Sequence, residues 1–128
     1  MIVAGIGSER GVSRDEVLAA LDAALARAEH GRDDVALLAA PAVKGGETAI
    51  SEAAAKLGLP LILVPQVQLE AASNRAKTRS ERVVAMLRVP SAAETAALAA
   101  AGAEAELLGP RLALGAVTCA LARKNLPS

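Results

Sequence analysis

The chain has 128 residues, of which 53% are hydrophobic, so it is long enough to bury one core and too short for two ordinary domains. Its 14 Lys and Arg residues balance its 14 Asp and Glu residues, which leaves no overall field to attract nucleic acid or an anionic membrane. Phe, Tyr and Trp are absent, so there is no aromatic surface for stacking bases or caging a cation.

The cysteine content and the hydropathy pattern indicate a compartment. Cys119 is the only cysteine, so it cannot form an intrachain disulfide, and with no histidine near it in sequence it is typical of a small core residue. There is no charged-then-apolar leader and no apolar run long enough to span a bilayer. We therefore expect one domain over residues 1–128 and a cytoplasmic location.

The first predicted element is a buried strand over residues 2–6 that runs into a glycine-rich turn. Such a turn is typical of phosphate sites, but Arg10 stands where the dinucleotide fingerprint requires a third glycine. No Gly-Lys-Ser/Thr triplet follows either. What remains is a loop containing Gly7 and Arg10 at the carboxyl end of a strand, where α/β sheets place their ligands.

A capping box of Ser13 with Glu16 starts an amphipathic helix that ends near Gly31. His30 lies in the last turn of this helix, where a histidine more often complements the helix dipole than binds a metal. No second histidine exists to complete a conventional metal site. We therefore expect no metal and no resident cofactor.

A second strand over residues 35–40 is followed by a helix that Gly58 ends. Lys44 and Glu47 lie on the loop between them, at the same kind of edge as the first glycine turn. Two interpretations stay open. Either Glu47 favours the helix N-terminus while Lys44 is solvated, or the two residues are a cation and a carboxylate at the mouth of a ligand site.

A third strand over residues 61–64 precedes a brief helical turn and then a shift in composition. Residues 73–82 carry four basic residues against one acid and end in a capping box of Thr78 with Glu81. A charged stretch is usually a solvated loop. Four cations near a helix start would also suit a ligand with several carboxylates, because Arg holds a carboxylate bidentately.

The clearest helix start in the chain is the capping box of Ser91 with Glu94, directly after Pro90. The helix that follows is nearly all alanine and stops at Gly102, so we expect it to lie close against another layer. On spacing alone, Glu94 is more typical of a capping residue than of a catalytic one.

Two more strands are predicted over residues 105–108 and 116–122, separated by a turn over residues 109–111. Thr118 in the last strand is either a ligand hydroxyl or simply a β-branched strand former. Strands that alternate with helical segments indicate a layered α/β domain with a largely parallel sheet.

Short motifs along the whole chain fall in one fixed order. They are Gly5-Ile6-Gly7 with Arg10-Gly11, Lys44-x-x-Glu47, Leu57-Gly58-Leu59-Pro60-Leu61, Ser80 with Val83, Val89-x-Ser91-x-Ala93-Glu94-x-Ala96-Ala97-Leu98, and Val117-Thr118-x-Ala120-x-Ala122-Arg123. In this order they resemble the CobE family, which is similar to the C-terminal domain of CbiG. Both belong to cobalamin biosynthesis.

The resemblance implies a three-layer α/β fold and a role in building the corrin ring, whose intermediates are macrocycles rimmed with acetate and propionate groups. We therefore expect a protein that binds a carboxylate-rich precorrin or corrinoid intermediate. The residues expected to bind it are Gly7, Arg10, Lys44, Arg79, Ser80, Arg82 and Thr118. Glu47 and Glu94 are expected to orient polar groups or to transfer protons.

Two other functions stay open. CbiG-type proteins open a lactone on a cobalt-precorrin intermediate and release acetaldehyde, so the chain is alternatively a C–C bond hydrolase of that type, with Glu47 or Glu94 as general base. In the first turn, Ser8 and Glu9 replace the more usual cysteine and basic residue of the family. The third possibility is a non-catalytic module that docks onto another cobalamin biosynthesis enzyme through alanine-rich surfaces.

Overall fold

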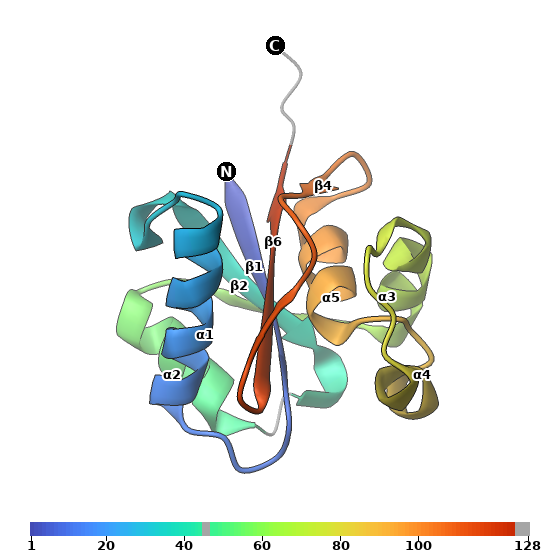
Figure 1. Cartoon of the computed structure of the whole chain (residues 1–128), viewed down its shortest axis with the longest axis horizontal. Coiled ribbons are helices and arrows are strands. Elements are labelled where there is room, and N and C mark those ends of the chain that lie inside the picture. The colour runs from blue at the N-terminus through green and yellow to red at the C-terminus, as the bar shows by residue number, and fades with distance from the viewer. Residues whose placement is uncertain (45–46, 125–128) are drawn as a thin grey trace.

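One twisted sheet with helices on both faces organises the computed structural model (Figure 1), which describes residues 1–44 and 47–124. The strand order is β3-β2-β1-β6-β4, and β5 also pairs with β6. The strands are β1 Ile2–Ser8, β2 Val35–Pro41, β3 Leu61–Val64, β4 Glu106–Leu107, β5 Leu112–Leu114 and β6 Val117–Arg123. The predicted α/β class is thereby confirmed.

Five of the six strands run in the same direction. β1 pairs in parallel with β2, as does β2 with β3, whereas β6 is antiparallel to β1, β4 and β5. The reversed strand β6 lies beside β1 near the middle of the sheet, so its first residues stand next to the last residues of β1. In this register Thr118 is opposite Gly7, and Val117 is opposite Ser8.

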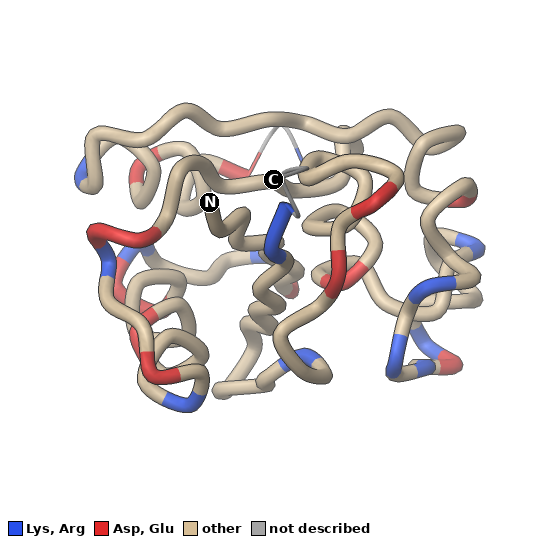
Figure 2. Tube along the Cα trace, turned by 90° about the horizontal axis from the view of Figure 1, so that it is seen from above, with Lys and Arg blue, Asp and Glu red and all other residues tan. Residues whose placement is uncertain are grey.

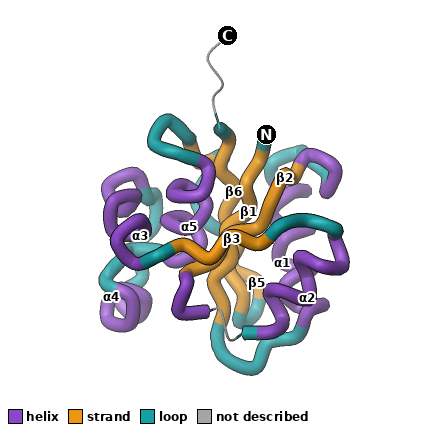
Figure 3. Tube along the Cα trace, turned by 180° about the vertical axis from the view of Figure 1, so that it is seen from behind, coloured by secondary structure: helices purple, strands orange, loops and turns teal. Residues whose placement is uncertain are grey.

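The helices form the two outer layers (Figures 1 and 3). The helix α1 Arg14–Arg27 and the helix α2 Thr48–Leu57 cover one face of the sheet. The other side carries α3 Gln66–Ala72, α4 Glu81–Leu87 and α5 Ala92–Ala101. Short 3-10 turns are η1 Arg32–Asp34, η2 Ala42–Lys44 and η3 Ser73–Arg75. Each outer layer buries its own apolar cluster against the sheet, as a three-layer arrangement requires.

The start of α4 differs from the prediction. The cap is Ser80, whose Oγ accepts a hydrogen bond from the amide of Val83 at 3.3 Å, and not Thr78. The backbone of Ser80 is fixed because its amide donates to the carbonyl of Pro90 at 2.8 Å. The amide of Thr78 donates to the side chain of Glu94 instead, which keeps Thr78 outside the helix. The predicted capping box of Ser13 with Glu16 is confirmed.

The alanine-rich helix α5 is the inner element that the sequence predicts. Eight of its ten residues are buried. It lies so close to β1 that a Cβ atom on Gly5 would stand 2.0 Å from the carbonyl oxygen of Ala93. In the described parts of the chain, no single helix is long and apolar enough to cross a bilayer; the bent pair of α4 and α5 meets only the length and composition test.

Cys119 in β6 is fully buried, which confirms its predicted place in the core, and desolvation raises the pKa of its thiol to about 12. Because the thiolate is the reactive form, we expect no reaction of the native protein with DTNB at about pH 8. Unfolding in urea should release one reactive thiol per chain. A native thiol that reacts as fast as free cysteine would show that β6 is not packed as described.

Candidate binding cleft

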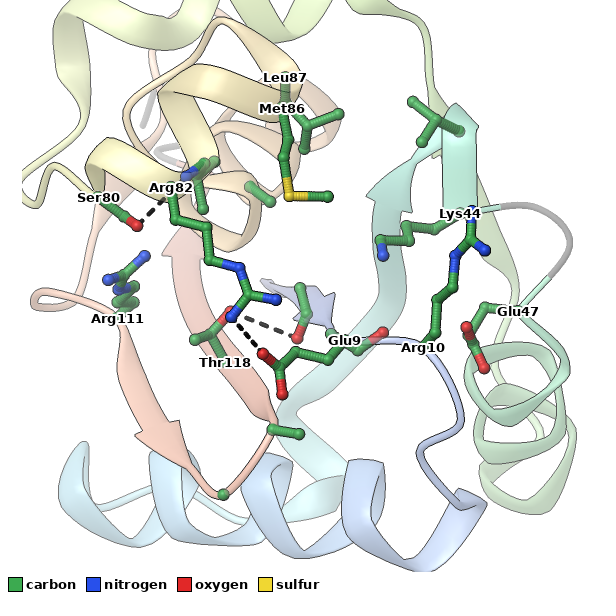
Figure 4. A pocket seen from close by; sticks show the side chains of 17 residues that line it. Glu9, Arg10, Lys44, Glu47, Ser80, Arg82, Met86, Leu87, Arg111 and Thr118 are labelled. Atoms are coloured by element: carbon green, nitrogen blue, oxygen red, sulfur yellow. Dashed lines mark hydrogen bonds and ion pairs between the residues drawn. The ribbon is translucent and has the colours of Figure 1, made fainter.

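A cleft of about 980 Å³ opens at the carboxyl ends of β1 and β2 (Figure 4). The end of β1 contributes Gly7 and Ser8 to its lining, β6 contributes Thr118, and the first turn of α5 contributes Ala92. The antiparallel pairing of β6 with β1 brings Thr118 here, because its register partner is Gly7. The cleft therefore lies at the sheet edge where the sequence predicts ligand binding.

At the base of the cleft, Gly7 leaves room for the side chain of Thr118. Thr118 Oγ1 donates to the carbonyl of Gly7 at 3.3 Å, and a Cβ atom on Gly7 would stand 2.6 Å from Thr118 Oγ1. Any larger residue at this position would displace Thr118. Beside it, the hydroxyl of Ser8 is buried and has no hydrogen-bond partner within the part of the chain that the structure describes.

Four basic side chains line the cleft, and we call them the cleft cations. They come from four different segments: the loop after β1, η2, α4 and the turn before β5. The cleft cations are Arg10, Lys44, Arg82 and Arg111. Figure 2 shows acidic and basic residues on both sides of the molecule, so the excess of cations in the cleft is a local feature of a neutral chain.

Two carboxylates also line the cleft, those of Glu9 and Glu47. Glu9 forms an ion pair with Arg82 that joins the loop after β1 to α4 (Figure 4). The side chain of Arg82 is 70% exposed and that of Glu9 is 49% exposed. Pairs this accessible to water contribute little stability, so a carboxylate on a ligand can replace Glu9 as the partner of Arg82.

An apolar surface faces these charges. Val43 and Met86 are 64% and 65% exposed, and both line the cleft together with Val83 and Leu87. We call this surface the apolar wall, and its members are Val43, Val83, Met86 and Leu87. A cleft with an apolar wall and several cations suits a molecule with an apolar body and an anionic rim.

The structure brings most of the predicted site residues together. Those that line the cleft are Gly7, Arg10, Lys44, Glu47, Ser80, Arg82 and Thr118. Arg79 and Glu94 do not. The side chain of Arg79 is 61% exposed and pairs with Glu81 at 2.8 Å, outside the cleft. Arg75 also points away from the cleft and donates to the carbonyls of Gly102 and Ala105. The basic stretch, residues 73–82, therefore lines the cleft only in part.

Glu94 is completely buried. Its backbone amide donates to Ser91 Oγ at 3.2 Å, which is one half of the predicted capping box. The other half is wrong, because the carboxylate does not return to the helix start. It accepts from the amides of Lys77 at 2.8 Å, Thr78 at 3.0 Å and Arg111 at 2.8 Å. A carboxylate shielded in this way has no contact with a molecule in the cleft, so we assign it no proton transfer.

Sequence reasoning missed three features of the cleft: Arg111, Glu9 as the partner of Arg82, and the apolar wall. Arg111 falls in a segment predicted only as a turn, and the strand that follows, β5, was not predicted. The available signal was the cation directly after Gly109-Pro110. In the described residues, no group of three or more His, Cys, Asp or Glu side chains is placed to hold a metal.

The fold and the cleft define a small α/β protein with a cationic binding site, and comparison with known proteins gives its family. The model of the family described as Cobalamin synthesis G C-terminus matches residues 2–122. Protein CobE from Sinorhizobium sp. is 36% identical over 121 residues, which cover 94% of this chain and 79% of that relative. The chain belongs to this CobE and CbiG C-terminal family of cobalamin biosynthesis proteins.

Solved structures agree with this assignment. The crystal structure of CobE, a protein from the cobalamin (vitamin B12) biosynthetic pathway, has a TM-score of 0.92 at 29% identity and covers 96% of this chain and 89% of its own. The cobalamin biosynthesis protein chiG from Agrobacterium tumefaciens has a TM-score of 0.75 at 37% identity, with 95% and 97% covered. A putative cobalamin biosynthesis protein G homolog from Sulfolobus solfataricus shares the fold at 22% identity and a TM-score of 0.73, over 94% of this chain and 36% of its own.

Proposed function

We propose that this chain binds a carboxylate-rich precorrin or corrinoid intermediate in the cleft. The observation that carries the proposal is that the four cleft cations and the apolar wall line one cavity of about 980 Å³. Small-molecule sites usually enclose about 300–1,000 Å³, so this cavity suits a large ligand. A corrin macrocycle has an apolar ring face and a rim of carboxylates, which matches both parts of the lining.

The lining residues divide the work of binding such a ligand. The cleft cations bind the peripheral carboxylates, and each Arg side chain can hold one of them through two parallel hydrogen bonds. The apolar wall covers one face of the ring. The hydroxyls of Ser80 and Thr118 bond to polar groups of the ligand.

Gel filtration with a coloured ligand tests this proposal. Because the chain has no Phe, Tyr or Trp, corrin absorption is measured without interference from the protein. We expect cobyrinic acid, a carboxylate-rich corrin, to co-elute with the protein, and cobinamide, its amidated counterpart, to elute separately. Co-elution of neither corrin, together with a stable complex with another cobalamin biosynthesis enzyme, would favour a docking module instead.

A specific observation also favours a second candidate function, a hydrolase that opens the lactone of a cobalt-precorrin intermediate and releases acetaldehyde. The carboxylate of Glu47 lines the cleft on the same side as Lys44 and Arg10 (Figure 4), where it could activate water as a general base.

For this candidate, Glu47→Gln should lower turnover of a lactone-bearing cobalt-precorrin at least about 100-fold while leaving ligand affinity within about threefold. Turnover is measured as acetaldehyde released over time. If the variant and the unmodified protein released acetaldehyde at the same rate, Glu47 would not be the general base. If neither released acetaldehyde, the hydrolase function would be contradicted and only the binding function would remain.

A further inference from the structure

Glu94 joins three segments that are far apart in sequence. Its Oε1 accepts from the amides of Lys77 and Thr78, at 2.8 and 3.0 Å. Its Oε2 accepts from the amide of Arg111 at 2.8 Å. The residue is 0% exposed and sits in the first turn of α5, which is packed against β1. One buried side chain therefore connects a rigid inner helix to two outer segments.

Each of these two segments carries part of the cleft lining. The segment that contains Lys77 and Thr78 leads directly into Ser80 and then Arg82 on α4. α4 has no fully buried residue, and only Val83 and Leu87 pack partly buried against the core, so hydrogen bonds at its start add to what holds it in place. Arg111, whose backbone amide donates to Glu94, also lines the cleft with its side chain, on the same side as Ser80 and Arg82 (Figure 4).

We propose that Glu94 is a positioning residue for the cleft, which fixes Arg111 and the start of α4 in the geometry that binds the ligand's carboxylates without touching the ligand. This inference rests on the proposed function. Hydrogen bonds from amides to a carboxylate are short and strong, and a buried amide that loses its acceptor carries the full cost of desolvation. The three hydrogen bonds to Glu94 therefore hold both segments firmly. Losing these bonds should shift the positions of the cleft cations, which themselves stay in the protein.

Glu94→Gln distinguishes the hydrogen bond from Arg111 from the two hydrogen bonds from Lys77 and Thr78. The oxygen of the amide side chain can keep the amides of Lys77 and Thr78, which share one oxygen in the native protein. Its NH₂ group then faces the amide of Arg111, donor against donor. We expect hydrogen exchange at the Arg111 amide to become at least about tenfold faster, while the amides of Lys77 and Thr78 keep their protection. Unchanged exchange at all three amides would overturn the inference.

The second readout is affinity for cobyrinic acid, measured by visible titration. We expect Glu94→Gln to weaken it roughly tenfold. In an Arg111→Ala background, which removes the side chain but keeps the backbone amide, the same change should cost less than about twofold, because the cation to be positioned is gone. The positioning role would be overturned if Glu94→Gln weakened the affinity equally in both backgrounds. It would also be overturned if the affinity stayed unchanged although exchange at the Arg111 amide became faster.

The matched control is Thr95→Val, on the same turn of α5. Thr95 is also fully buried, and its hydroxyl donates to the carbonyl of Ser91 at 2.6 Å within the helix, away from the cleft walls. We expect it to leave affinity within about twofold. Should Glu94→Gln fail to fold, Glu94→Asp, which keeps the charge and shortens the reach, takes its place with the same readouts. Unmodified protein that does not bind cobyrinic acid would overturn the proposed function itself, whereas equal binding by both proteins overturns the positioning role alone.

Discussion

Gly5→Ala is expected to lower the free energy of unfolding by about 3 kcal/mol or more, a large part of the roughly 5–15 kcal/mol that stabilises a typical domain. A Cβ atom on Gly5 would stand 2.0 Å from the carbonyl oxygen of Ala93 and 2.7 Å from the amide nitrogen of Ala97. Both are backbone atoms of α5, so no side-chain rotation relieves the overlap. β1 and α5 would have to separate, and both carry part of the cleft. Urea unfolding followed by far-ultraviolet circular dichroism measures the loss.

Gly31→Ala is the control for this prediction. A Cβ atom on Gly31 meets nothing within 4 Å, and its φ of −116° is accessible to any residue. We expect the free energy of unfolding to change by less than about 0.5 kcal/mol. If the two variants unfolded at the same urea concentration, the close approach of α5 to β1 would be contradicted.

Arg82→Glu is expected to weaken the binding of cobyrinic acid roughly 100-fold. The change removes a cation that lines the cleft and places a second carboxylate beside Glu9, so the anionic rim of the ligand meets repulsion where it met attraction. Cobinamide has no such rim and should respond far less. Visible titration at one fixed ionic strength measures both affinities, because the attraction is screened by salt.

Arg79→Glu is the same change three positions earlier in the chain, at a residue that pairs with Glu81 outside the cleft. We expect it to alter the affinity by less than about threefold. If both reversals weakened binding equally, the basic stretch would act through its overall charge, and the cleft would not be the binding site.

Local patterns predicted the elements of this fold well. The strand over residues 61–64 has the predicted bounds, and the capping serines Ser13 and Ser91 start their helices as expected. These features depend on contacts within a few residues, which periodicity and capping rules describe directly. The direction of β6 depends instead on its pairing with β1, and alternation of apolar residues is the same for either direction.

The cleft was predictable only in part for the same reason. Gly7 and Lys44 were found because they follow strands whose carboxyl ends meet at one edge of an α/β sheet. Thr118 was named for its hydroxyl and by the family resemblance, and it reaches the same edge only because β6 runs antiparallel to β1. Arg111 reaches the cleft through β5, a strand too short to show a pattern. Glu94 has the spacing of a capping residue, and only the tertiary fold supplies the three distant amides that its carboxylate accepts from.

Amide chemical-shift mapping of the ¹⁵N-labelled protein with cobyrinic acid tests most directly whether a carboxylate-rich corrin binds in the cleft. We predict that the largest shifts appear at Gly7, Arg82, Arg111 and Thr118, and that cobinamide leaves these amides nearly unchanged. Shifts gathered instead on the exposed residues of β3, Ile62 and Leu63, or shifts of equal size with both corrins, would contradict the account.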